Sequence, residues 1–154
     1  MATVYLGLGT NLGNKAANLQ AAVKLINEKI GKVTSLSSFY ETAPWRFSSE
    51  HSFLNAAVEV YTTLLPIEVL HITQSVEREL GRTQKSSGGV YADRLIDIDI
   101  LLYDQLIIQT PELVLPHPLM TQRDFVMLPL TEIAGEVIHP VFHQQLKELI
   151  PHHQ

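Results

Sequence analysis

Apolar side chains along the chain follow two repeats, one with the period of a strand and one with the period of a helix. Strands are predicted where apolar or β-branched residues run together or alternate with polar ones. These stretches are residues 4–8, 33–40, 53–63 and 95–103, and the last is the strongest signal. Polar segments rich in Pro, Gly or Ser predict loops at residues 42–52 and 82–94.

Two helices are predicted between these strands. Apolar residues at helical spacing mark the first, and they are Leu19, Ala22, Val23, Ile26 and Ile30. Gly31 is placed to end this helix. The second helix begins at Pro66, since proline is favoured in the first turn, and ends at Gly81.

The resulting order is β-α-β-β-α-β, followed by a C-terminal extension. This order is typical of the ferredoxin-like class of α+β folds, in which one antiparallel four-stranded sheet carries both helices on one face. The extension would cover part of the other face with α/β elements, giving α-β-α layers. We therefore expect a single domain over residues 1–154.

Three short elements are expected in the extension. The first is a hairpin around Thr110. The second is a short helix that follows a capping-box-like pair, Thr121 and Asp124, and runs through Leu130. Pro129 should end or kink that helix, because an interior proline removes a backbone donor. The third is a helix over residues 144–150.

Composition narrows the classes of protein that this domain can be. The chain has 154 residues, 45% hydrophobic, enough for one buried core. It has no cysteine, which excludes disulfides, thiolate metal sites and cysteine nucleophiles. A net charge of −5 argues against nucleic acid as the main partner. With no targeting signal or membrane-spanning run, and no unexplained apolar stripe, we expect a cytoplasmic monomer.

Asp97 and Asp99 are the sharpest chemical feature of the sequence. They lie two residues apart on a strand, so their side chains share one face, while residues 96, 98, 100 and 102 point to the other. Adjacent carboxylates repel each other unless a cation joins them, and hard oxygen ligands suit Mg²⁺. We favour a magnesium site over the alternative, a solvated polar face of an edge strand.

Cations near the aspartate pair suggest a ligand with several negative charges. The loop of residues 82–94 carries Arg82, Lys85 and Arg94. A polyphosphate ligand would explain both the cations and the Mg²⁺ site, because its oxygens bind the metal and basic side chains at once. The loop would also close over the site and exclude water. An ordinary surface loop is the alternative reading.

His117 and Arg123 are further candidate donors. His117 lies between two prolines, which hold it stiffly, and Arg123 falls in the first turn of a predicted helix. Near a phosphate-binding strand both would donate to phosphate oxygens. A lone histidine is more often structural than catalytic, so this interpretation depends on the aspartate pair.

Aromatic and amide side chains suggest a site for a flat heterocycle. An aromatic and an amide on one strand face offer stacking and a hydrogen-bonding edge. The candidates are Phe53, Asn55 and Phe125 with the loop residues Thr42, Ala43, Pro44 and Trp45. Pattern alone does not single out these residues, because most phenylalanines are core residues. The glycines of residues 7–13 do not fit the dinucleotide fingerprint, so we expect them to allow a tight strand-to-helix turn.

Together these segments resemble the 6-hydroxymethyl-7,8-dihydropterin pyrophosphokinases of folate biosynthesis. The resemblance covers residues 4–140. It rests on residues 9–13, 38–42, 53–58, 77–82, 94–101 and 116–118, in matching order and separation. It departs from the common pattern at Gln84, Tyr91-Ala92-Asp93, Glu112 and Pro118.

The resemblance implies a ferredoxin-like fold and a reaction in which the diphosphate of ATP moves to the pterin hydroxymethyl oxygen and AMP is released. Two Mg²⁺ ions would be bound by Asp97 and Asp99, and these residues with Arg82 and Arg94 would be catalytic. The expected ATP contacts are Gln74, Glu77, Arg82, Lys85, Arg94, the backbone around Ile100, His117 and Arg123. The expected pterin contacts are Thr42, Ala43, Pro44, Trp45, Phe53, Asn55, Asp97 and Phe125.

Three other functions are alternatives to this one. A nucleotidyl transferase would release pyrophosphate instead of AMP, but the chain lacks a basic surface for a polymer. A regulatory domain that binds a small molecule would need neither the aspartate pair nor the loop cations. An RNA-binding sheet would need exposed aromatic residues in pattern and a basic charge.

Overall fold

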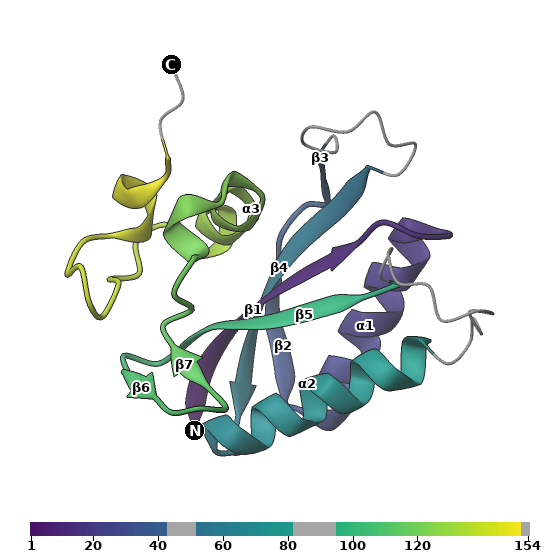
Figure 1. The fold of residues 1–154 in the computed structure, drawn as a ribbon, viewed down its shortest axis with the longest axis horizontal. Coiled ribbons are helices and arrows are strands. Elements are labelled where there is room, and N and C mark those ends of the chain that lie inside the picture. The colour runs from purple at the N-terminus through teal and green to yellow at the C-terminus, as the bar shows by residue number, and fades with distance from the viewer. Residues whose placement is uncertain (43–51, 82–94, 152–154) are drawn as a thin grey trace.

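The computed structural model describes residues 1–42, 52–81 and 95–151, and its main feature is a five-stranded antiparallel sheet in the order β2-β4-β1-β5, with β3 paired to β4 (Figure 1). The strands are β1 (Ala2–Thr10), β2 (Lys32–Leu36), β3 (Tyr40–Thr42), β4 (Phe53–Thr62), β5 (Asp97–Tyr103), β6 (Ile108–Gln109) and β7 (Val114–Leu115). The α-helices are α1 (Lys15–Lys29), α2 (Pro66–Gly81) and α3 (Asp124–Ala134), with 3₁₀ turns at Met120–Gln122 and Leu146–Leu149. This order confirms the ferredoxin-like expectation, except that the short strand β3 adds a fifth strand to the four expected.

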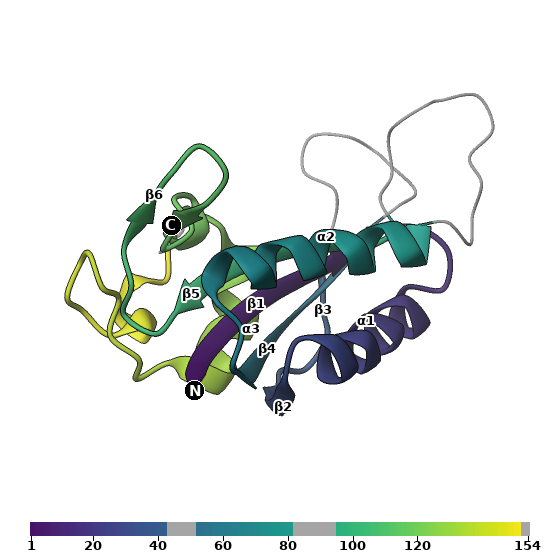
Figure 2. The same cartoon turned by 90° about the horizontal axis from the view of Figure 1, so that it is seen from below.

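The first face of the sheet packs against α1 and α2. Alternate residues of β1, Val4, Leu6 and Leu8, point to this face, as the strand period requires. They meet the buried stripes of both helices, including Leu19 and Val76. Figure 2 shows the two helices side by side along the sheet. Each fully buried aliphatic side chain contributes about 1.5–3 kcal/mol, so this layer is the main source of stability.

The second face is covered at one end by α3 and the C-terminal segment (Figure 1). Met127 and Leu130 of α3 are fully buried against Tyr5 and Leu101 of the sheet. Glu132 joins the helix to the sheet, because its carboxylate accepts from the Tyr40 hydroxyl at 2.6 Å and from the backbone and side chain of Ser38. These hydrogen bonds, that from Tyr40 first, lower the pKa of Glu132.

The alternation predicted for the last strand fails at one position. Pairing passes from Leu6 opposite Ile100 to Tyr5 opposite Leu102, so Leu101 is an extra residue on β5. A bulge of this kind shifts every later side chain to the other face. Leu102 therefore packs with Leu101 on the α3 side, and the prediction that it shares the face of Ile98 and Ile100 is wrong.

The strand predicted over residues 33–40 is also corrected, because it divides into β2 and β3. Ser37 lies between them and is buried. Its hydroxyl accepts from the backbone N–H of Ala57, while its own N–H donates to the Ala57 carbonyl. A side chain thus occupies a place in the hydrogen-bond ladder, and the regular strand breaks there.

The C-terminal elements differ in detail from their predictions. The cap of α3 is Arg123 and makes no side-chain hydrogen bond, so the pair of Thr121 and Asp124 is not a capping box. Pro129 does not end the helix, which continues to Ala134 because its apolar face is buried on the sheet. The last predicted helix is a 3₁₀ turn over Leu146–Leu149. The predicted hairpin forms as β6 and β7.

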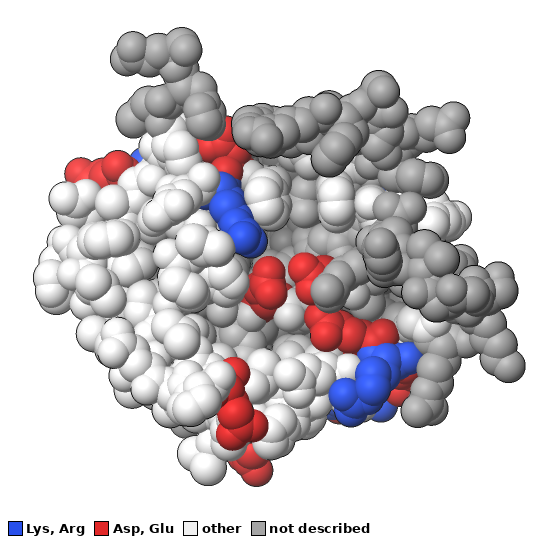
Figure 3. Space-filling model, in the orientation of Figure 1, with Lys and Arg blue, Asp and Glu red and all other residues white. Residues whose placement is uncertain are grey.

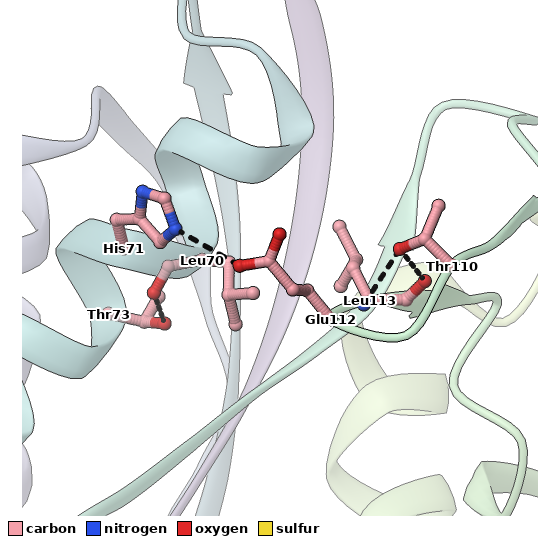
Figure 4. Close-up of polar contacts among 6 residues, drawn as sticks. All are labelled: Leu70, His71, Thr73, Thr110, Glu112 and Leu113. Atoms are coloured by element: carbon pink, nitrogen blue, oxygen red, sulfur yellow. Dashed lines mark hydrogen bonds and ion pairs between the residues drawn. The ribbon is translucent and has the colours of Figure 1, made fainter.

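The turn between β6 and β7 lies against α2. Figure 4 shows the Glu112 carboxylate facing the ring of His71, with 3.7 Å between Oε2 and Nε2. Beside it, the Thr110 hydroxyl accepts from the N–H of Leu113 and donates to the Leu113 carbonyl. Both side chains are largely exposed, so this pair adds little stability. Across the described residues, no helix is long and apolar enough to cross a membrane.

Candidate functional site

The second face of the sheet changes character along its length. Under α3 it carries Tyr5, Ala57 and Leu101, which we call the apolar half. Further along the same three strands it carries Gly9, Asn55, Asp97 and Asp99, which we call the polar half. Register places these residues together, because Gly9 of β1 pairs with Asn55 of β4 on one side and with Asp97 of β5 on the other.

Asp97 and Asp99 share this face, as predicted. Both are half-buried, while Ile98 between them is buried in the core beneath the helices. Figure 3 shows acidic side chains gathered over β5 and the neighbouring end of α2, with basic side chains bordering them. In the described part of the chain, no group of three or more His, Asp or Glu side chains is placed to hold a metal ion alone. The pair fits Mg²⁺ that takes its other ligands from water and substrate phosphates.

His117 lies near enough to the aspartate pair for both carboxylates to affect its pKa. Its backbone N–H donates to the carbonyl of Leu101, the extra residue of the β5 bulge, at 3.0 Å. Burial is the main cause that lowers the pKa of His117, and Arg123 lowers it further, whereas Asp99 and Asp97 act in the opposite direction. Because Nδ1 accepts from the N–H of Leu119 at 3.2 Å, the neutral ring presents Nε2–H as a donor.

Arg123 and Phe125 complete this border of the site. The Arg123 guanidinium carbon lies 5.6 Å from the centre of the Phe125 ring, within cation–π range. The influence of Arg123 on the pKa of His117 places it near the histidine as well. Phe125 is 41% exposed, which is unusual for phenylalanine and leaves a ring face available for stacking.

Phe53 and Asn55 lie on the opposite border, on β4. Phe53 is 40% exposed, whereas Asn55 is only 4% exposed. The Asn55 Nδ2 donates to the Thr42 hydroxyl of β3 at 3.2 Å, and strand pairing sets Thr42 opposite Phe53. Three of the predicted pterin contacts are therefore adjacent. Ala43, Pro44 and Trp45 lie outside the described residues.

A pocket separate from this sheet face lies beyond the edge of β5. Gln74, Glu77, Arg78 and Gly81 of α2 line a cavity of about 560 Å³ with Leu95 and Ile96. The Glu77 carboxylate accepts from the N–H of Ile98 at 2.7 Å, so it binds the outer edge of the strand. The backbone of Ile100 points to the same edge, because strand residues alternate in pairing direction. Arg82, Lys85 and Arg94 lie outside the described residues.

Some supporting residues were missed by the sequence analysis. Lys15 Nζ donates to the carbonyl and hydroxyl oxygens of Ser52, and the Ser52 hydroxyl donates to Glu41. These contacts fix Ser52, the residue before Phe53. No pattern in the sequence predicts that Lys15, Ser52 and Glu41 lie together.

The interpretation of the glycines in residues 7–13 was correct only in part. Gly13 has φ 69° and allows the turn as expected, whereas Gly9 lies inside β1.

Comparison with known proteins places this geometry in a family. Residues 5–135 match the family described as 7,8-dihydro-6-hydroxymethylpterin-pyrophosphokinase. A relative from Porphyromonas gingivalis, named 2-amino-4-hydroxy-6-hydroxymethyldihydropteridine pyrophosphokinase, is 56% identical over 141 residues, 91% of this chain and 95% of the relative. A protein of the same name from Aquifex aeolicus is 42% identical over 98% of this chain and 92% of its own length.

Solved structures agree on the fold. A Plasmodium falciparum HPPK-DHPS structure with pterin and p-hydroxybenzoate superposes with a TM-score of 0.77 at 18% identity. The match covers 96% of this chain and 42% of that longer one.

Proposed function

The chain belongs to the 7,8-dihydro-6-hydroxymethylpterin-pyrophosphokinase family, and we propose that the polar half of its sheet is where it carries out the family's reaction. It is a pyrophosphokinase of folate biosynthesis and takes ATP as co-substrate. It transfers the ATP diphosphate to the hydroxymethyl oxygen of 6-hydroxymethyl-7,8-dihydropterin and releases AMP. The observation that carries the assignment of the site is the grouping of Asp97, Asp99, His117 and Arg123 beside exposed aromatic rings.

Asp97 and Asp99 are proposed to hold two Mg²⁺ ions. When bound, Mg²⁺ neutralises the triphosphate and polarises its oxygens. The aspartates meet the requirement for this role, because they share a face and stand on a rigid strand between core residues. Asp97 also pairs across β1 with the pterin side of the site, so its carboxylate is suited to orient the attacking hydroxyl.

The remaining side chains position the two substrates. His117 presents its Nε2–H to a phosphate oxygen, and Arg123 adds a charged donor; Arg82 and Arg94, with Lys85 as a weaker contact, are proposed to do the same from the loop. Gln74, Glu77 and the edge of β5 at Ile100 lie along the nucleoside. Phe53 and Phe125 stack on the pterin, while Asn55 and residues 42–45 read its polar edge.

The chemical step follows from this positioning. The hydroxymethyl oxygen forms a bond to the β-phosphorus in line with the bond that breaks between that phosphorus and the oxygen of AMP. AMP leaves with the bonding electrons, and the hydroxyl proton passes to solvent or to a nearby carboxylate. A loose transition state needs little help from a strong base, so alignment and neutralisation of charge supply the acceleration.

We further propose that residues 1–154 form one catalytic domain that works as a monomer in the cytoplasm. Light scattering coupled to size-exclusion chromatography tests this, and a stable dimer would contradict it.

Phosphorus NMR tests the proposed reaction directly. The protein is mixed with ATP, Mg²⁺ and 6-hydroxymethyl-7,8-dihydropterin, with an EDTA-treated sample as control. We expect signals of AMP and a pterin diphosphate that are absent without Mg²⁺. Release of pyrophosphate would indicate nucleotidyl transfer instead, and unchanged ATP from folded protein would contradict catalysis.

A further inference from the structure

Gly9 occupies the centre of the polar half. It is the residue of β1 that pairs with both Asn55 and Asp97. Adjacent strands lie about 4.8 Å apart, so Asn55 and Asp97 flank a strip of backbone roughly 10 Å wide. Because Gly9 has no side chain, this strip is bare on the face that both residues share.

The space above Gly9 is shaped by Asn55. A β-carbon built at Gly9 would lie 3.0 Å from the Asn55 Oδ1, closer than carbon and oxygen normally approach. Asn55 has little freedom to yield, because it is 4% exposed and its Nδ2 donates to the Thr42 hydroxyl. With Nδ2 engaged by Thr42, the Oδ1 is directed over β1.

Gly7, two residues earlier on the same face, has a different environment. A β-carbon there would lie 3.3 Å from Cδ1 of Leu101, the end of a flexible aliphatic side chain in the apolar half. The same substitution therefore meets a hydrogen-bonding group at Gly9 and a methyl group at Gly7.

We propose that Gly9 is a specificity-determining position of the pterin site, which acts by leaving the Asn55 Oδ1 in place over a bare floor of β1 backbone. The inference rests on the proposed function and adds a residue to it. An Oδ1 in this position accepts from an N–H on the edge of a flat heterocycle, and the bare backbone lets the ring lie low enough to reach it. Gly9 is a positioning residue, since it acts through Asn55.

Gly9→Ala tests the proposal, with Gly7→Ala as its matched control. Alanine suits a strand interior better than glycine, which offsets the strain of the close contact with Asn55, so both variants should fold and Gly9→Ala should have the lower melting temperature of the two. For Gly9→Ala we expect the KM for the pterin, and its Kd by titration calorimetry with a non-hydrolysable ATP analogue, to rise roughly three- to tenfold. The KM for ATP should change less than about twofold, and Gly7→Ala should shift the pterin KM less than Gly9→Ala.

A double-mutant cycle separates this mechanism from a general disturbance of the sheet. If Gly9 acts through Asn55, then adding Gly9→Ala to an Asn55→Ala protein should change the pterin KM by less than about twofold. Additive effects, equal rises in both KM values, or an unchanged pterin KM would each overturn the proposal. An inactive wild-type protein would instead count against the proposed function.

A folding defect in Gly9→Ala would also be informative. Asn55→Ser shortens the side chain that a β-carbon at Gly9 would meet. It should restore the fold of Gly9→Ala if contact with Asn55 is the cause. A fold that stays lost would overturn the proposal.

Discussion

The apolar and polar halves of one sheet face use the same three strands for opposite purposes. In the apolar half, Tyr5 and Leu101 are sealed under Met127 and Leu130 of α3. In the polar half, the strands present glycine, an amide and carboxylates. The backbone pairing is continuous between them, so the difference lies in the side chains and in what covers them.

The comparison shows how a small domain combines a firm support with a reactive surface. Groups that carry charge gain precision when their strands are held by a packed core. The β5 bulge links the two halves, because the extra residue Leu101 packs under α3 while its carbonyl accepts from His117. Stability should therefore respond to changes in the apolar half, and catalysis to changes in the polar half.

The largest effect is expected at the metal pair. Asp97→Asn and Asp99→Asn should each lower kcat/KM by about 10³-fold or more, because substrate charge is no longer neutralised. The free energy of unfolding should change much less than the activity does, since asparagine keeps the shape of aspartate and removes one of two like charges. Steady-state kinetics and urea denaturation on the same samples check this, and lost stability with retained turnover would break the comparison.

The apolar half should show the reverse pattern. Leu130 is fully buried, so Leu130→Ala should cost about 2–5 kcal/mol of stability. Leu128 is 42% exposed on the same helix, and Leu128→Ala should cost less than about 1 kcal/mol. Both KM values should remain near wild type wherever the protein is folded. Denaturation midpoints would contradict the account if the two variants were equally destabilised.

A smaller effect is expected at the exposed aromatic border. Phe125→Leu keeps an apolar side chain but removes the ring, and aromatic stacking is worth about 0.5–1.5 kcal/mol. We expect the pterin KM to rise roughly two- to tenfold with little change in stability. The comparison would be weakened if the ATP KM rose instead, because the ring would then serve the nucleotide.

The smallest effect concerns pH and the C-terminal turn beside the apolar half. His139 is buried, and its Nδ1 accepts from the N–H groups of Val141 and Phe142. Burial lowers its pKa, and His143 lowers it further. The folded state thus binds fewer protons than the unfolded state, where the pKa is about 6.5.

The contribution of neutral His139 to the free energy of unfolding should be complete above about pH 6.5. It should decline as the pH falls toward the lower pKa of His139 in the folded state. Urea denaturation at several pH values from 7.5 to 5 measures the slope of the free energy of unfolding against pH. His143→Asn should reduce this slope, because it removes the side chain that further lowers the pKa of His139. Asparagine is chosen because it tolerates the positive φ of 58° at this position. An unchanged slope in a His139→Asn protein would show that another group is responsible.

Much of the fold was predictable because its signals are local and regular. The helix at Pro66–Gly81 was predicted with its bounds, since proline and glycine mark both ends. The antiparallel sheet with both helices on one face followed from the order of elements. The Leu101 bulge and the break at Ser37 were not predictable, because each depends on a partner strand far away in the sequence.

The candidate site was predictable only in part. Strand alternation alone pairs Asp97 with Asp99. The proximity of His117 to them depends on the bulge, and Asn55 reaches Thr42 only through the pairing of β3 with β4. The role of Gly9 was missed, because an absent side chain has meaning only beside neighbours that register supplies.

The central claim is that the polar half holds the metal ions of the reaction. Electron paramagnetic resonance of Mn²⁺, titrated with protein and a non-hydrolysable ATP analogue, measures this directly. We predict about two bound Mn²⁺ per wild-type chain, and clearly fewer for the folded Asp97→Asn, Asp99→Asn double variant. Equal binding of Mn²⁺ by both proteins would contradict the account, because the metal would then be held elsewhere.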